Sequence, residues 1–581
     1  MSSDPENEYF SDGMTEEIIN ALSRIEGLQV TARTSSFVFK GSNKDIRSIG
    51  QELGVALVLE GSIRKAGDRV RITAQLIRTD NGFHIWSENF DRKLTDIFAL
   101  QDEISLLIAG KIREDFGHFD IQDRLVESPT TNIEAYQLYL KGRFYHNRWN
   151  LTAFAEAADI YQQSIDEDPS FDLPYFGAGL SYSFLGSWGG MDRQEAFKLA
   201  DEYFRQGLLL NTPSHYSYYC VAKHLFWGKW NYKDAYELLL KAYKLNPEHS
   251  DTNEFIAEIN TAVGDFPTAL KHINTSLSLN PLAPSHFYTK ANICYLQGEF
   301  LQAISLVDKA LILEPDFVVV IELKLACQIQ AGLYDELKES LVKHQDLLLP
   351  ELYELMYTLI WQPGEVDSFQ IELMINQVRQ AQPALLFAWD LFLLIHSGDA
   401  EGSMRLLEEK ATNKVGQIIN FKHDPFLKPL RQLDAYTKLE QQYFSVNKMT
   451  AVVKGKAKQK ELLDEENAQQ YTELLLFKME KEKRYLAQDL NLRELAKEIN
   501  LHPNKLSWLL NNKLEKNFSD FVNSYRLKEF QAQAIDDRNS HLSLLGLAYE
   551  SGFNSKSVFN EYFRKATGLT PRSWVKQQQQ D

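Results

Sequence analysis

Cysteine is scarce in this sequence of 581 residues, and long apolar runs are missing. The three cysteines, Cys220, Cys294 and Cys327, lie too far apart for a zinc motif or a disulfide framework. They favour buried thiols in a reducing compartment. The most apolar stretch, residues 384–396, contains Asp390 and is too short to span a bilayer. The first six residues are polar and acidic, unlike a signal peptide. These absences predict a cytoplasmic protein with no membrane partner.

Positive charge is also scarce, and it is unevenly placed. The net charge is −18, which by itself argues against nucleic-acid binding because phosphates need cations. Residues 478–581, however, carry 17 Lys and Arg against 13 Asp and Glu, so this tail has a net charge of +4 and residues 1–477 have −22. The tail is therefore the only large segment suited to approach DNA.

The first 118 residues alternate helical and strand patterns, which predicts a small α/β domain. Apolar residues follow a helical period at residues 15–22, 45–53 and 94–112, and strand patterns occur at 28–32, 55–63, 70–76 and 84–90. The continuous apolar run at 55–63 predicts a strand buried on both faces, whereas the alternation at 70–76 predicts one buried face. Hairpin turns are expected at residues 66–68 and at Asn81-Gly82.

Four motifs in this segment resemble the TolB-like domain, which is attached to bacterial regulators and to some adenylate cyclases. They are residues 12–17 (DGMTEE), 32–37 (ARTSSF), 59–64 (LEGSIR) and 97–103 (IFALQDE). Members of that family begin with an apolar strand that has no counterpart before Ser3. We therefore expect a sheet that lacks one strand and exposes an edge.

Residues 133–350 contain an internal repeat of 34 residues. Prolines, alanines at predicted helix crossings, and glycines where first helices end all recur at this spacing: Pro213, Pro247, Pro281 and Pro315; Ala235, Ala269 and Ala303; Gly264, Gly298 and Gly332. The pattern is typical of the tetratricopeptide repeat, a helix hairpin that buries its apolar face only by stacking on the next hairpin. Each proline is expected to close its repeat, with Pro350 the last.

Such an array usually binds a protein or peptide, which is the partner we expect for residues 133–350. After Pro350 the period decays, so residues 351–444 are expected to form degenerate helical hairpins or a cap. Residues 445–466 are polar and rich in lysine, and we interpret them as a solvated linker. A helix over 467–481, with Leu474, Leu475 and Phe477 facing inward, is expected to follow.

Two helix-turn-helix patterns then follow in tandem. In the first, residues 492–499 form a helix, Asn500 suits a left-handed turn, and Pro503 starts the next helix. In the second, residues 544–550 form a helix, Gly552 lies in the turn, and Asn554 is expected to cap the next helix. A connecting helix is predicted over residues 518–534. Two such units with equal internal spacing are a far stronger signal than one.

Residues 552–571 contain Gly-Phe-x-Ser-x-Ser-x-Phe and then Phe-Arg-Lys-x-x-Gly-x-Thr-Pro, which resembles the AraC/XylS signature. Further matches at 485–486, 495–496 and 517–526 extend the resemblance over about 100 residues. It implies an all-α double helix-turn-helix domain that binds promoter DNA. The expected contacts are polar, cationic and aromatic side chains on and beside the second helix of each unit: Asn504, Lys505, Ser507, Trp508, Asn511, Asn554, Ser555, Lys556, Ser557, Asn560, Arg564 and Lys565.

Two residues on these helices fit DNA less well. Trp508 either packs on a thymine methyl group or is simply buried. Glu561 would repel phosphate, so it is expected to face cytosine or solvent. A packed helical bundle without DNA binding is the alternative interpretation of the tail.

The sequence therefore predicts a multidomain protein: a small α/β TolB-like domain (1–118), an all-α tetratricopeptide superhelix (133–350), degenerate hairpins or a cap (351–444), a linker (445–466) and an all-α AraC-type DNA-binding domain (467–577). The predicted function is a DNA-binding transcription factor that couples a signal to sequence-specific binding of double-stranded promoter DNA, with a homodimer left open. No enzyme activity, cofactor or metal site is expected. The alternatives are a scaffold or adaptor with a non-binding tail, and a nucleotide-handling enzyme, for which the sequence offers no metal-carboxylate site.

Overall fold

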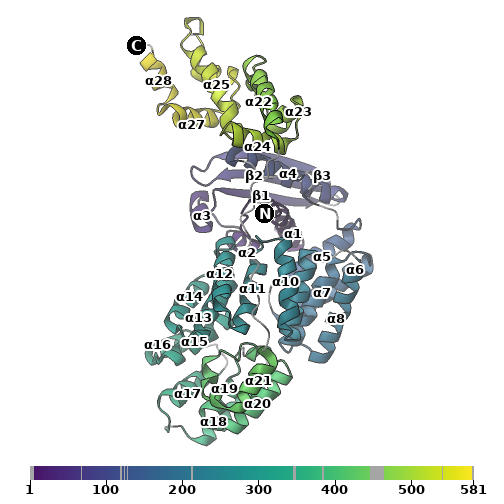
Figure 1. Ribbon diagram of the computed structural model, residues 1–581, viewed down its shortest axis with the longest axis vertical. Helices are drawn as coiled ribbons and strands as arrows, with labels where there is room; N and C mark the ends of the chain where they lie inside the picture. The colour runs from purple at the N-terminus through teal and green to yellow at the C-terminus, as the bar shows by residue number, and fades with distance from the viewer. Residues whose placement is uncertain are drawn as a thin grey trace.

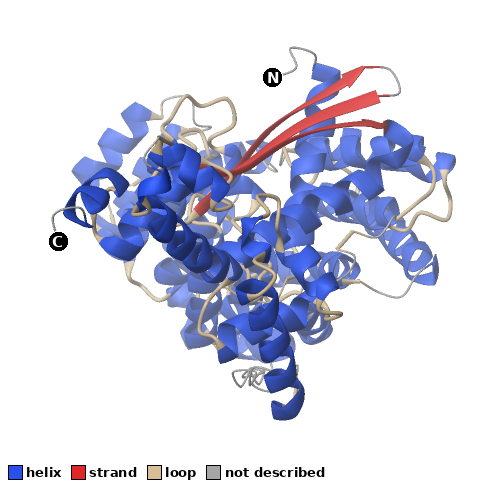
Figure 2. Ribbon diagram, turned by 90° about the horizontal axis from the view of Figure 1, so that it is seen from above, coloured by secondary structure: helices blue, strands red, loops and turns tan. Residues whose placement is uncertain are grey.

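The computed structural model describes residues 5–578, except for 26, 67–68, 118–120, 123–124, 127–128, 149, 211–213, 345–348, 365, 382–384, 386, 445–462 and 540. The fold is mainly helical with one small sheet (Figure 2). Along the longest axis, the sheet lies between the C-terminal helices on one side and a large set of stacked helices on the other (Figure 1). None of the described helices is both long and apolar enough to cross a membrane.

The N-terminal domain packs helices against a three-stranded antiparallel sheet in the order β1-β2-β3. Its elements are α1 (Pro5–Leu22), α2 (Arg33–Phe37), α3 (Ile46–Leu53), β1 (Leu57–Ala66), β2 (Arg69–Arg78), β3 (His84–Lys93), η1 (Leu94–Asp96) and α4 (Ile97–Phe116). Val70, Ile72, Ala74 and Leu76 of β2 are buried in one core with α1 and α4, as the alternation predicts. Gly82, with φ +75°, makes the predicted turn between β2 and β3.

Three predictions for this domain fail or lie outside the described residues. Residues 28–32 form no strand, because Ala32 donates its N–H to Leu279 O at 3.3 Å, across to the stacked helices. Strand β1 has no fully buried residue among those described, because it is an edge strand and not the interior strand that its apolar run suggested. Of the turn expected at 66–68, residues 67–68 lie outside the described part of the chain.

Helix hairpins at the predicted period follow the N-terminal domain. The second helices of successive hairpins begin 34 residues apart, at Tyr232, Phe266, Phe300 and Tyr334. The helices are α5 (Ile133–His146), α6 (Leu151–Glu167), α7 (Leu173–Ser187), α8 (Arg193–Leu210), α9 (His215–Lys223), η2 (His224–Gly228), α10 (Tyr232–Leu245), α11 (Ser250–Val263), α12 (Phe266–Leu279), α13 (Pro284–Leu296), α14 (Phe300–Leu313), α15 (Val318–Ala331) and α16 (Tyr334–Lys343).

The repeated small residues have the expected structural roles. Ala235, Ala269 and Ala303 are fully buried where the helices cross closely. Gly264, Gly298 and Gly332 have φ values of +90°, +83° and +72° at the ends of first helices, a conformation that glycine adopts without strain. The repeat prolines Pro247, Pro281 and Pro315 follow helix ends as predicted, whereas Pro213 lies outside the described residues. Pro350 is a correction, because it begins a helix and does not close one.

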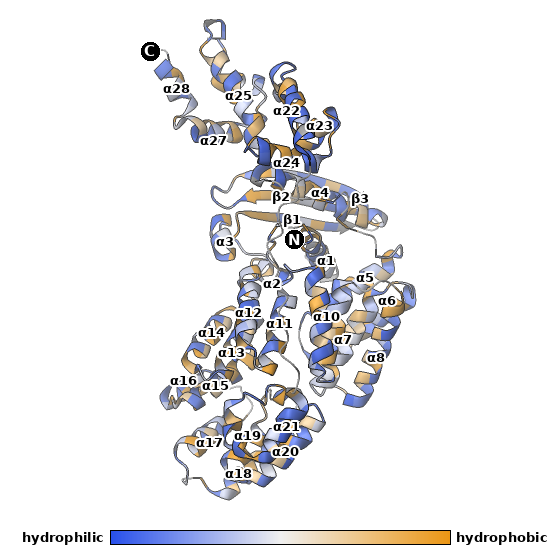
Figure 3. Ribbon diagram, in the orientation of Figure 1, coloured by the Kyte–Doolittle hydropathy of each residue, from blue (hydrophilic) through white to orange (hydrophobic). Residues whose placement is uncertain are grey.

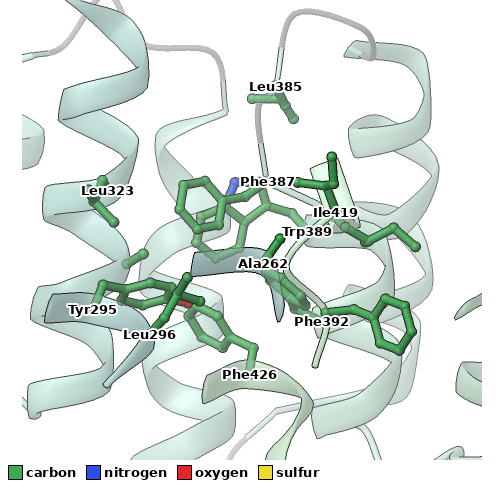
Figure 4. Packing of buried hydrophobic residues seen from close by; sticks show 14 of the residues in the cluster. Ala262, Tyr295, Leu296, Leu323, Leu385, Phe387, Trp389, Phe392, Ile419 and Phe426 are labelled. Carbon is green, nitrogen blue, oxygen red and sulfur yellow. The ribbon is translucent and has the colours of Figure 1, made fainter. Parts of the chain in front are cut away.

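The helices after Pro350 add a large aromatic core to this end of the array. They are α17 (Pro350–Trp361), α18 (Ser368–Ala381), α19 (Trp389–His396), α20 (Ala400–Thr412), η3 (Gly416–Ile418), η4 (Pro425–Gln432) and α21 (Asp434–Phe444). Trp389 lies among Phe387, Phe392 and Phe426 (Figure 4). Its ring centroid is 5.3 Å from that of Tyr353 and 5.5 Å from that of Phe426. Its indole N–H donates to Glu322 Oε1 at 3.2 Å. All three cysteines are buried and free, as predicted.

The C-terminal tail contains α22 (Glu465–Glu480), η5 (Arg484–Leu486), α23 (Leu492–Glu498), α24 (Pro503–Lys513), α25 (Phe518–Ala534), η6 (Asp537–Asn539), α26 (Leu544–Glu550), α27 (Lys556–Thr567) and α28 (Pro571–Gln578). Apolar and polar residues are interspersed along these helices (Figure 3). In α22, Leu475 is buried but Leu474 and Phe477 are exposed, which corrects the prediction that all three face inward. Most of the predicted linker, residues 445–462, lies outside the described chain.

Candidate nucleic-acid interface

The first helix-turn-helix unit consists of α23 and α24. Asn500 has φ +53°, and the next residue, Leu501, donates its N–H to Ala496 O at 2.9 Å, which closes the turn. Ala496 is fully buried at this close crossing. Pro503 occupies the start of α24, where its missing N–H costs no helical hydrogen bond. On the inner face of α24, Leu506, Leu509 and Leu510 are buried, as the sequence predicts.

The second unit, α26 and α27, repeats this construction. Gly552 has φ +97°, and Phe553 donates its N–H to Ala548 O at 3.1 Å. A Cβ on Gly552 would lie 2.2 Å from Tyr485 O, so only glycine fits this turn. The cap of α27 is Ser555, whose hydroxyl accepts the Val558 N–H at 3.2 Å, and not Asn554 as expected. Phe559 and Phe563 are buried against Phe530 of α25.

Helix α25, which has the predicted bounds, fixes the two units relative to one another. Its Arg526 is buried and donates to Tyr485 O and to Ala487 O, both at 2.7 Å. Burial lowers the pKa of Arg526 to about 10, so the guanidinium stays charged at neutral pH. Gln488, in the segment before α23, further donates to Tyr549 O of α26 at 3.0 Å. The sequence assigned no role to Arg526.

The predicted contacts on α27 lie together on an exposed side of the helix. Lys556, Asn560 and Arg564 line an open hollow of about 720 Å³, together with Glu561 and Lys565. The remaining walls come from Asn81 and Phe83, at the turn between β2 and β3. Lys565 also pairs with Asp520 of α25 at 3.1 Å. Asn554 is exposed and Ser555 is half-buried. The side chain of Ser557 lies outside the described residues.

The predicted contacts on α24 are mostly covered, which the sequence did not anticipate. Lys505 is exposed, but Asn504, Ser507 and Trp508 are buried, and Asn511 is half-buried. Trp508 belongs to the apolar core of the first unit, so of its two proposed roles the structure supports burial.

Asn504 instead contacts the N-terminal domain. Its Nδ2 donates to Ile121 O at 2.8 Å, and its Oδ1 accepts from the Arg113 guanidinium. Helix α24 lies beside the sheet and α4 (Figure 1).

Further contacts join the N-terminal domain to the tail. Glu114 Oε1 accepts the Leu492 N–H at 3.1 Å, and Asp115 Oδ1 accepts the Ser519 hydroxyl at 2.7 Å. Glu561 is exposed, which agrees with the solvent alternative, and it also lies 3.6 Å from Arg78, a cation of β2. Sequence reasoning missed all of these partners because they lie hundreds of positions away. The poor fit of Glu561 to DNA was the one available signal.

Comparisons with known proteins match two parts of the chain. Residues 495–577 match a helix-turn-helix domain, and residues 4–107 match the second domain of HilA/YgeH-like transcriptional regulators. The TolB-like resemblance of residues 1–118 therefore stays a prediction. Together, the two matches support a DNA-binding transcription regulator.

A curated relative from Rhizobium meliloti (strain 1021), named "Putative adenylate cyclase 3", is 40% identical over 194 residues. The match covers 33% of this chain and 32% of that relative, so the chain spans about a third of its length. Similar solved structures include Pseudomonas aeruginosa pilF, with 19% identity and a TM-score of 0.29 over 42% of this chain and 97% of that one. Another is YrrB, described as a TPR protein with an unusual peptide-binding site, with 20% identity and a TM-score of 0.23 over 34% and 98%.

Proposed function

We propose that this chain is a transcription regulator whose tail is an AraC-type double helix-turn-helix domain that binds promoter DNA by sequence. The observation that carries the proposal is the repeated construction of α23–α24 and α26–α27, each with a left-handed residue four positions after a buried alanine. In this function α24 and α27 enter successive major-groove segments, about 34 Å apart. The tail is also the part of the chain with net positive charge.

Individual side chains then take different parts in DNA binding. Asn560 and Arg564 project from the exposed side of α27 and contact base edges, while Lys556, at its first turn, contacts phosphate. Lys505 is an exposed cation in the first turn of α24. Asn504 and Asn511 join these contacts only when α24 is free of the N-terminal domain.

The other two parts receive the signal in this proposal. The stacked hairpins bind a protein or peptide partner, as arrays of this construction usually do. The N-terminal domain, with its TolB-like motifs, lies between that array and the tail and connects them (Figure 1). This role needs no catalytic residue.

The decisive experiment uses the tail alone, residues 463–581, which contains two apolar clusters of its own. Its affinity for a site selected from random DNA is compared with its affinity for unselected DNA over a range of salt concentrations. We expect the selected site to bind at least about 10³-fold more tightly, with affinity for both falling steeply as salt rises. A folded tail that binds neither DNA would support the scaffold or adaptor alternative.

A further inference from the structure

The face of the tail that the proposed function assigns to DNA is occupied by the N-terminal domain. Both ends of the Asn504 amide bind that domain: Nδ2 donates to Ile121 O at 2.8 Å, and Oδ1 accepts from Arg113 and, at 3.4 Å, from the Ile121 N–H. Further along α24, Asn511 Oδ1 lies 3.6 Å from where a Cβ on Gly117 would be. Two predicted DNA contacts of the first unit therefore face protein.

Two carboxylates at the end of α4 accept hydrogen bonds from donor groups of the tail. Glu114 accepts the backbone N–H of Leu492 at 3.1 Å. Asp115 accepts the Ser519 hydroxyl at 2.7 Å through Oδ1 and the Asn517 amide at 2.8 Å through its backbone oxygen. Backbone N–H groups, hydroxyls and side-chain amides at helix starts are the groups that DNA-binding proteins use to hold phosphates. In this structure, Glu114 and Asp115 accept hydrogen bonds from these donor groups of the tail.

The second unit is obstructed by the tip of the sheet. Asn81 and Phe83 form the far wall of the hollow that Lys556, Asn560 and Arg564 line, and Glu561 is paired with Arg78 at 3.6 Å. Because Asn81 and Phe83 stand opposite these side chains, a duplex whose major groove received α27 would meet the tip of the sheet.

We infer that the N-terminal domain holds the tail in a closed arrangement that excludes DNA, and that DNA binding requires the two to separate. The inference rests on the proposed function, because it concerns the same recognition helices. The charges favour closure, since the tail carries +4 and the remainder of the chain −22. If only a fraction of molecules is open, the apparent affinity of the whole chain for DNA is reduced by that fraction.

The test locks the closed arrangement in the full-length protein. Asp115→Cys and Ser519→Cys replace two side chains that are in contact. Glu103→Cys with Ser519→Cys is the control pair, because Glu103 lies nearer the start of α4, where it pairs with Arg92. The three natural cysteines are buried and do not compete. We expect the first pair, and not the control, to form a disulfide. Oxidation should then lower DNA affinity at least about tenfold, and reductant should restore it.

A second pair of variants tests whether weakening the closed arrangement, with no substitution in the tail, increases DNA binding. Glu114→Gln with Asp115→Asn removes the two carboxylates that bind the tail, and Glu88→Gln with Glu103→Gln removes two charges of the same domain that do not. The first variant should bind DNA several-fold more tightly than the natural chain, and the second should not.

Failure of the first pair to cross-link, or equal DNA binding by its oxidised and reduced forms, would overturn the inference. Equal DNA affinity of the two charge-removal variants would also overturn it. Absence of DNA binding by the reduced chain, the opened variant and the tail alone would overturn the proposed function itself, and the inference with it.

Discussion

Ser35 and Asn280 lie 245 positions apart in the chain, yet Ser35 donates its backbone N–H to Asn280 Oδ1 at 3.0 Å. The Ser35 hydroxyl in turn accepts the Leu282 N–H at 2.7 Å. Asn280 ends α12, and Ser35 lies within α2, so these bonds join the array to the N-terminal domain. Both side chains are almost completely buried, which excludes water from the contact.

Replacing Asn280 should weaken this junction. Asn280→Ala leaves the buried N–H of Ser35 without an acceptor, which costs about 1–3 kcal/mol. Asn246→Ala is a matched control one repeat earlier, at the end of α10, where the side-chain oxygen has no hydrogen-bond partner among the described residues. Hydrogen exchange of α2 and denaturant unfolding of the full chain measure the effect. Equal protection of α2 in both variants would show that the contact does not hold the domains together.

The glycine in the second turn of the tail should tolerate no side chain. Gly552→Ala places a Cβ 2.2 Å from Tyr485 O and 2.9 Å from Leu486 Cα, both backbone atoms that cannot move aside locally. Gly568→Ala is the control, because it also has positive φ (+75°) but nothing within 4 Å of the added atom. Gly568→Ala should cost only about 1 kcal/mol of backbone strain. Gly552→Ala should cost clearly more, seen as faster hydrogen exchange in α25 and α27.

Stability of the array should depend on pH through His286. Its Nε2 lies 3.4 Å from Glu254 and 3.7 Å from Asp251, and these carboxylates raise its pKa to about 10 despite burial, which opposes the shift. A raised pKa stabilises the fold fully below the unfolded value of about 6.5, and this contribution is lost as pH rises through 10.

The free energy of unfolding of the natural chain should therefore fall between pH 6.5 and 10, and the fall should be smaller in His286→Gln. His272→Gln is the control, because burial lowers the pKa of His272 to about 4 and it is neutral throughout this range. Parallel curves for the natural chain and His286→Gln would show that the ion cluster does not contribute.

Cations on α27 should set the salt dependence of DNA binding. Lys556→Ala should weaken binding to all sequences and reduce the slope of log affinity against log salt by about 0.9. Arg564→Ala should cost about 1–3 kcal/mol on the selected site and relax its specificity. Lys481→Ala, an exposed cation at the end of α22, is the control. If the tails that carry Lys556→Ala, Arg564→Ala and Lys481→Ala remain folded and bind DNA with equal affinity and salt dependence, α27 is not a recognition helix.

Local patterns predicted the helices and turns of this protein well. Asn500 has the left-handed conformation expected of it, Gly552 lies in the predicted turn, and α25 has its predicted bounds, because these features depend on neighbouring residues. The period of 34 placed the array helices for the same reason. Errors arose where contacts with distant segments determine the structure, as for residues 28–32, which form no strand and of which Ala32 bonds to Leu279 of the array.

The candidate DNA-binding residues show the same difference between local and distant determinants. Lys556, Asn560 and Arg564 lie on one exposed side of α27, as helical spacing requires. Asn504 has the same kind of position on α24, but it is buried by Arg113 and Ile121, which are 391 and 383 positions away. No periodicity within the tail sequence could reveal that Asn504 is buried by residues of the N-terminal segment.

The N-terminal domain contacts the array through Ser35 and the tail through Asp115, so in the proposed function it couples the two in both directions. A partner of the array that binds only when the tail is detached would raise the affinity of the protein for DNA. Thermodynamic linkage then requires that DNA raise the affinity of the protein for that partner by the same factor. Promoter occupancy and partner occupancy would rise together at the sites where the protein acts. Molecules away from DNA would hold the partner weakly, so a signal would be retained mainly where it is used.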